Sequence, residues 1–89
     1  MRLIPIAVDK LIKILQKSGF QPVRQTGGHL ILRHPDGRSI PVPIHGFKEI
    51  PPRLLNTILK QAGINREEFF KLLKQILVLL GIASKRDTK

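Results

Sequence analysis

The sequence predicts an α+β domain, in which a three-stranded antiparallel sheet is covered on one face by helices. Two observations predict this class. Apolar residues recur at spacings of three and four toward both ends of the chain, whereas its middle alternates apolar and polar residues at a period near two. At 89 residues the chain is long enough for one domain only. We therefore predict a single domain over residues 1–83 and a flexible tail over residues 84–89.

The first expected helix covers residues 9–18 and has one apolar face and one lysine-rich face. Asp9 is the expected N-cap, since its side chain can accept a hydrogen bond from a free backbone N–H of the first turn. Gly19 suits the left-handed position that ends many helices, and this geometry would bring Phe20 back onto Leu15. We expect the helix to end at this glycine.

Three short segments with a period near two come next, and we expect them to form an antiparallel meander. Their sequences are FQPVRQ, HLILRH and SIPVPIH, at residues 20–25, 29–34 and 39–45. Proline cannot donate a hydrogen bond to a neighbouring strand, and the first and third segments contain proline. The second segment is therefore the expected central strand.

The alternation also predicts which residues face the helices. One set comprises Leu30, Leu32, Ile40, Val42 and Ile44, and the opposite, open face then carries His29, Ile31, Arg33 and His45. Ile31 is apolar on a face that is otherwise polar, and a shift of one residue would reverse the two faces.

Two more helices are expected after the sheet. The second begins at the proline pair 51–52 and ends before Gly63. Asn65 followed by Glu68 forms a capping-box pattern, which opens a third helix over residues 66–80. This last helix is apolar around more than one face, so we expect it to contact a second copy or another partner as well as its own domain.

Composition restricts the function before any motif is considered. Sixteen Lys and Arg residues against six Asp and Glu residues give a formal charge of +10, which favours a polyanion such as nucleic acid as the partner. The chain has no cysteine, which excludes disulfides and thiol chemistry and suits the cytoplasm. Its most apolar stretch, residues 76–83, is far shorter than the roughly 18 residues that cross a membrane. We expect a cytoplasmic protein without membrane association.

The three histidines are His29, His34 and His45. Their spacing matches no metal-binding motif, and we expect neither a metal nor a cofactor. RNA cleavage needs only groups that move protons and cations that stabilise phosphate charge, and a histidine can move protons at neutral pH. From the residues alone, His29 is a candidate acid or base or simply an exposed strand residue. His45 is the candidate second acid or base, and His34 fits a turn.

The stretch LIKILQKSGFQPVRQTGGHLILRHPDGRSIPVPIH, with IPPRLLNTILKQAGI after it, resembles the HicA (YcfA-like) family of mRNA interferase toxins over about residues 3–73. The resemblance implies a fold similar to the double-stranded RNA-binding domain. It also implies metal-independent endoribonuclease activity on mRNA centred on His29, and inhibition by a HicB-like antitoxin that covers the site. The expected RNA contacts are Arg24, Gly27, Gly28, Arg33 and Arg38. The family motif is usually Gly-Ser-His, whereas this chain has Gly27-Gly28-His29, which predicts a weaker enzyme.

Three other functions are weighed at this stage. A sequence-reading binder of single strands is the weakest, since the chain has no Tyr or Trp and its four Phe residues mostly suit the core or an interface, which leaves no stacking platform. A non-catalytic double-stranded RNA-binding module would need no histidine, although the lysine pattern of that module's second helix is absent and LKQAG offers only Lys60. A protein-binding module would act through the apolar third helix.

Overall fold

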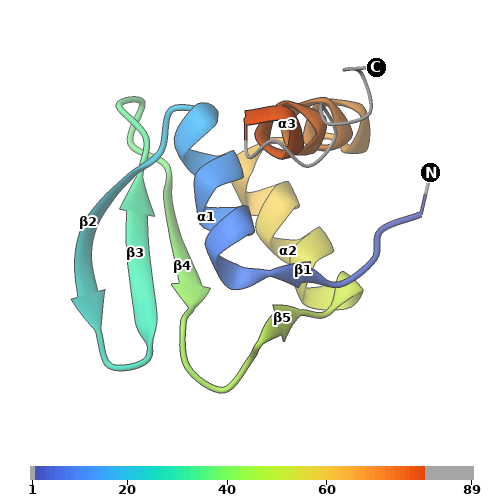
Figure 1. Cartoon of the computed structure of the whole chain (residues 1–89). Coiled ribbons are helices and arrows are strands. Elements are labelled where there is room, and N and C mark those ends of the chain that lie inside the picture. The colour runs from blue at the N-terminus through green and yellow to red at the C-terminus, as the bar shows by residue number, and fades with distance from the viewer. Residues whose placement is uncertain (1, 80–89) are drawn as a thin grey trace, which may run out of the picture.

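The computed structural model describes residues 2–79, and their elements form two small sheets and three helices (Figure 1). In chain order they are β1 (Ile6–Ala7), α1 (Val8–Lys17), β2 (Gln21–Thr26), β3 (His29–Arg33), β4 (Ser39–Pro43), β5 (Glu49–Ile50), α2 (Pro52–Ala62) and α3 (Arg66–Leu79). All three helices lie on the same side of the sheet formed by β2, β3 and β4 (Figure 1). The predicted α+β class is confirmed. The predicted last residue of the third helix, the boundary at residue 83 and the tail at 84–89 lie outside the described residues.

The three-stranded sheet has the strand order and the faces that the alternation predicted. Its order is β2–β3–β4, and both pairs are antiparallel. Leu30 lies opposite Val42, and Leu32 lies opposite Ile40. Leu32, Ile40 and Val42 are fully buried, and Leu30 packs half-buried against the same core. The register is therefore the predicted one, with Ile31 on the face away from the helices.

Four predicted strand ends are wrong. The first strand ends at Thr26 rather than at residue 25, and the second ends at Arg33 rather than at residue 34. The other two differ for local reasons. The first strand begins at Gln21 rather than at Phe20, because the Phe20 N–H closes the end of α1 by donating to the Leu15 carbonyl at 3.0 Å. The third strand ends at Pro43 rather than at residue 45, because its partner β3 begins only at His29.

The first helix begins earlier than the sequence predicted. Its N-cap is Ala7, not Asp9, and Asp9 lies inside the first turn, where its carboxylate still faces the positive end of the helix dipole. The cause is the pairing of β1 with β5, which sets Ile6 opposite Ile50 and leads the chain directly into the helix. Sequence analysis missed both strands, since a two-residue strand shows no periodicity.

The other helix ends follow the predicted chemistry. Gly19 has a φ of +102° and Gly63 a φ of +73°, and the N–H groups of Phe20 and Ile64 donate to carbonyls five residues earlier, at 3.0 Å in each case. The side chain of Asn65 accepts a hydrogen bond from the Glu68 N–H at 2.8 Å, which confirms the predicted start of α3.

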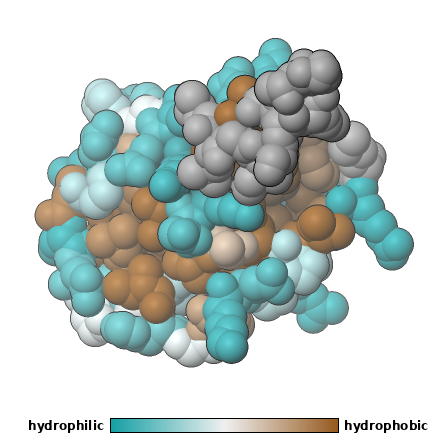
Figure 2. All heavy atoms as spheres, in the orientation of Figure 1, coloured by the Kyte–Doolittle hydropathy of each residue, from teal (hydrophilic) through white to brown (hydrophobic). Residues whose placement is uncertain are grey.

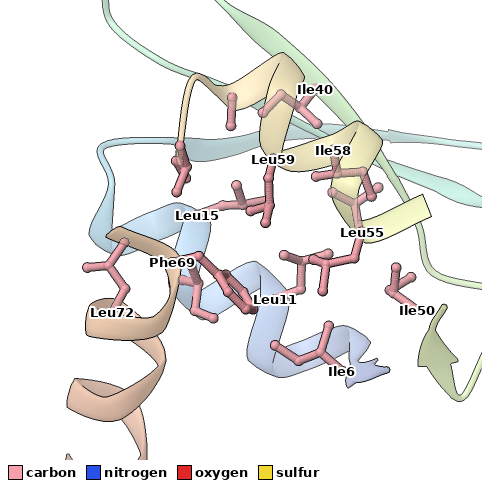
Figure 3. Packing of buried hydrophobic residues seen from close by; sticks show 14 of the residues in the cluster. Ile6, Leu11, Leu15, Ile40, Ile50, Leu55, Ile58, Leu59, Phe69 and Leu72 are labelled. Atoms are coloured by element: carbon pink, nitrogen blue, oxygen red, sulfur yellow. The ribbon is translucent and has the colours of Figure 1, made fainter. Parts of the chain in front are cut away.

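The hydrophobic core lies between the three helices and the inner face of the sheet. Leu11 and Leu15 of α1, Leu55 and Leu59 of α2, and Phe69 of α3 converge in its centre (Figure 3). No described polar or charged side chain is buried. Apolar side chains also reach the surface beside the lower ends of β3 and β4, next to the start of α1 (Figure 2). On α3, Val78 is 46% exposed, so part of the predicted second apolar face is open to solvent.

Candidate functional site

The sheet face that points away from the helices is not covered by any described helix (Figure 1). Residues that lie directly opposite one another in an antiparallel pair share a face, so the register defines its members. We call this surface the open face, and it comprises three rows across the strands: Thr26, His29 and Pro43; Arg24, Ile31 and Pro41; and Gln21, Arg33 and Ser39. A bulge at Val23 keeps Arg24 in step with these rows, since the register shifts between Pro22 and Arg24.

His29 is the first residue of β3 and lies at one end of the open face. A loop of only two residues, Gly27 and Gly28, connects it to Thr26, its neighbour across the hairpin. Gly27 has a φ of +58°, which favours glycine, and a side chain there would have open space around it. The imidazole of His29 is exposed, and it has no hydrogen-bond or ion-pair partner within residues 2–79. The imidazole is therefore open to contact with a ligand.

His45 lies at the same end of the sheet. The Ile44 N–H donates to the Gly28 carbonyl at 2.8 Å, which holds the chain after β4 beside the glycine loop. A Cβ atom at Gly28 would lie 3.5 Å from Cδ2 of His45, so the two residues are in contact range. The fold thus brings His45 next to the residue that precedes His29, as the predicted pairing required.

Two arginines supply positive charge on the open face. Arg24 lies one row from His29 on the adjacent strand. Diagonal neighbours of this kind have Cα atoms about 7–8 Å apart. Arg33 is four residues along β3 from His29, roughly 13 Å away. None of the nine open-face residues is acidic, so no carboxylate on this face offsets the two guanidinium charges.

Arg38 lies in a different environment, at the turn between β3 and β4. Its Nε donates to both carboxylate oxygens of Asp36, at 3.1 and 2.8 Å, and its Nη1 donates to the Ala62 carbonyl at the end of α2. The guanidinium also lies 5.3 Å from the centre of the Phe20 ring, a cation–π arrangement. The predicted RNA contact at Arg38 stays a prediction. In the structure this side chain connects the turn to the end of α2 at Ala62 and to Phe20, which follows α1.

The same turn engages His34 and Asp36. The His34 ring meets Phe20 edge to face at 5.2 Å, and its Nδ1 accepts a hydrogen bond from the Asp36 N–H at 3.2 Å. The Arg38 N–H donates to the Asp36 carboxylate at 3.0 Å, and this bond, more than the neighbouring charges, lowers the pKa of Asp36. His34 therefore belongs to the turn at the opposite end of β3 from His29. Sequence analysis missed this cluster, because no local pattern links residue 38 to residue 62.

Two other kinds of site are absent from the described residues. Within residues 2–79, no group of three or more His, Cys, Asp or Glu side chains could hold a metal ion. No described helix is long and apolar enough to span a membrane.

The fold and the open face define a class: a small basic α+β domain whose uncovered sheet face carries histidine and arginine side chains. The family model described as the HicA toxin of bacterial toxin-antitoxin matches residues 8–64, which is more than half of the chain. The chain belongs to the HicA toxin family and is a toxin of the toxin–antitoxin type. The match begins at α1 and ends just after α2, so α3 lies beyond it. A search of curated proteins found no match.

Proposed function

We propose that the protein is a metal-independent endoribonuclease that cleaves mRNA, with His29 as a catalytic acid or base. One observation carries the proposal: His29 is exposed at the end of the open face, with Arg24 on the adjacent strand and His45 beside the preceding glycine. Imidazoles and guanidinium groups are the groups that RNA cleavage requires, and nothing else in the reaction needs a bound cofactor.

The chemistry follows from the substrate, because RNA carries its own nucleophile. One imidazole, in its neutral form, removes the proton from the ribose 2′-hydroxyl as that oxygen forms a bond to the adjacent phosphorus. The bond between phosphorus and the 5′-oxygen breaks, and a protonated imidazole donates a proton to this leaving oxygen. The products are a 2′,3′-cyclic phosphate and a free 5′-hydroxyl. We assign one of these roles to His29 and the other to His45.

Arg24 is the residue we assign to the scissile phosphate. A guanidinium can donate two parallel hydrogen bonds to phosphate oxygens, and its charge stabilises the negative charge that develops in the transition state. The glycine loop allows the phosphate backbone to approach closely, because neither residue carries a side chain. Arg33 lies farther along the same face, where it can contact a neighbouring phosphate.

A HicB-like antitoxin is the protein partner we propose, in keeping with the family. An antitoxin that covers the open face would exclude RNA from His29 and would need acidic groups to match Arg24 and Arg33. The proposed site of action is the cytoplasm, where mRNA is available.

The test is cleavage of a mixed mRNA substrate by purified protein in EDTA. We expect His29→Ala to lower the rate by a hundredfold or more, which is about the contribution of a general acid or base. His29→Gln should lose as much, because it keeps a polar side chain but cannot move a proton. Circular dichroism and thermal melting should show that both variants fold.

Product analysis makes the test specific to this mechanism. The fragments should end in 2′,3′-cyclic phosphate, and the all-deoxy analogue of a cleaved RNA should stay intact because it lacks the nucleophile. Equal cleavage by wild type and His29→Ala would contradict the proposal. RNA binding without any cleavage would favour a non-catalytic double-stranded RNA-binding module instead.

A further inference from the structure

Three aliphatic side chains occupy the open face, although the core lies on the other side of the sheet. Ile31 lies opposite Pro41 in the middle row, and Pro43 lies opposite His29 in the next row. Ile31 and Pro43 are half-buried and Pro41 is exposed. None of the three belongs to the hydrophobic core cluster or to the residues packed against it. We call Ile31, Pro41 and Pro43 the aliphatic strip.

Folding alone does not account for the strip. A sheet that packs one face on a core and exposes the other places polar residues on the exposed face. The core packing that selects Leu32, Ile40 and Val42 does not act on the opposite side of the strands. The strip therefore points to an apolar surface that lies against the open face when the protein acts.

The charges around the strip indicate the chemistry of that surface. Arg24 lies directly opposite Ile31 in the same row, and Arg33 lies two residues along β3 from it. No acidic residue shares the face, so a ligand with regularly spaced negative charges and flat apolar groups between them is complementary to it. A nucleic acid strand has this composition.

The strip favours single-stranded RNA over an RNA duplex as the ligand. In an RNA duplex the faces of the bases are stacked inside the helix, and a protein meets phosphates, 2′-hydroxyls and the edges of the minor groove. In a single strand the faces of the bases are open, so they can lie against side chains of the protein while the phosphates pair with cations. Aliphatic side chains gain from covering such a flat, weakly polar surface.

We propose that the aliphatic strip binds nucleobases of single-stranded RNA beside the scissile phosphate, which restricts cleavage to unpaired segments. This inference rests on the proposed function, since it places the bases on the face where His29 acts. Bases lie over Ile31, Pro41 and Pro43, and the flanking phosphates lie toward Arg24 and Arg33. The strip is thus a binding surface for the substrate of the same site.

The experiment measures binding rather than cleavage, so it uses the His29→Ala protein as background. Fluorescence anisotropy gives the affinity for three probes: a short unstructured RNA, the same sequence in a perfect duplex, and a strand of the same length without bases. The test variant is Ile31→Thr, which keeps the β-branched shape and replaces the apolar end with a hydroxyl. The matched control is Val23→Thr, because Val23 is 48% exposed on the same sheet but lies at the bulge, outside the rows of the open face.

We expect Ile31→Thr to weaken binding of the unstructured RNA by about fivefold to tenfold, the size expected when apolar contact worth one or two methylene groups is lost. Binding of the strand without bases should not change, since it offers the strip nothing to pack against. Val23→Thr should leave all three affinities within about twofold. Cleavage by the protein with His29 intact should be confined to unpaired segments.

Each outcome decides the inference. A loss with Ile31→Thr that is equal for the RNA and for the strand without bases, or no loss at all, would overturn it. Tight binding and cleavage of the duplex would overturn it as well. In these cases His29-dependent cleavage of mRNA would still stand, because it is measured separately. Failure of the protein to bind any RNA would overturn the inference and the proposed function together.

Discussion

Each end of strand β3 has a histidine, and the two differ in their surroundings. At one end, His29 follows the glycine loop with its imidazole exposed and without a partner among the described residues. At the other end, the side chains of His34 and Arg38 contact Asp36, Phe20 and the last carbonyl of α2. The comparison shows that a histidine in this basic protein either packs into the fold or stays exposed, according to what the chain places beside it.

The largest effect on stability should come from a substitution at Gly19, which lies beside the ring of His34 at the end of β3. A Cβ atom there would lie 2.7 Å from Nε2 of His34, and the φ of +102° is unfavourable for any side chain. We expect Gly19→Ala to lower the free energy of unfolding by about 2–3 kcal/mol in urea denaturation. Gly37→Ala is the matched control, because Gly37 has a φ of +100° and open space around it. Equal losses in the two variants would show that contact with His34 contributes nothing.

Replacing Arg38 and Arg33 by alanine, one at a time, separates an arginine that stabilises the fold from one that is exposed. Arg38→Ala removes the hydrogen bond to the Ala62 carbonyl and the contact with Phe20, so we expect a loss of stability of about 1–2 kcal/mol. Arg33→Ala should change stability by less than about 0.5 kcal/mol but should weaken RNA binding, because Arg33 is exposed on the open face. Thermal melting and RNA anisotropy on both variants check this pattern, and the reverse result would contradict it.

The exposed end should tolerate a side chain at Gly28. A Cβ atom there would be 3.5 Å from the His45 ring, which is ordinary van der Waals contact, and no unfavourable φ applies. We expect Gly28→Ser to leave the melting temperature unchanged and to raise the rate of mRNA cleavage severalfold, because it adds a hydroxyl that can donate to phosphate. Gly28→Ala separates the hydroxyl from the added volume, and an equal rate gain with alanine would rule the hydroxyl out.

The smallest effect should be the pH dependence of stability that Asp36 contributes in the turn between β3 and β4. The pKa of Asp36 is lowered from 3.8 by the hydrogen bond from the Arg38 N–H, so its carboxylate stabilises the fold above about pH 4. This contribution should be lost as pH falls from there through the lower pKa of the folded state. Urea denaturation of wild type and Asp36→Asn should show a difference at pH 6 that shrinks below pH 4. A difference that is the same at both pH values would argue against the role of Asp36.

Much of the fold could be predicted because its signals are local. Gly19, Gly63 and Asn65 end or begin helices through hydrogen bonds within a few residues, and all three were predicted from the sequence. The period of two along β3 predicted which side chains are buried. The start of α1 was predicted wrongly, because its position depends on the pairing of β1 with β5, more than forty residues away.

Some features of the candidate site could likewise be predicted from the sequence, and others could not. The exposure of His29 at the end of a strand followed from the alternation and from the glycine pair before it. The alternation also placed His45 on the same face as His29, and the structure adds that His45 lies within contact range of Gly28. The contacts of Arg38 with Phe20 and with the Ala62 carbonyl had no signal in the sequence.

The sequence by itself therefore determined the helix ends, the faces of the strands and the excess of positive charge, because each depends on neighbouring residues or on composition. Only the tertiary structure decided which basic side chains remain exposed and which are held by contacts within the fold. Arg33 and Arg38 are five residues apart and chemically identical, yet one lies on the open face and the other bonds to Ala62. That difference arises from contacts between segments that are distant in the chain, and such contacts form only when the helices pack against the sheet.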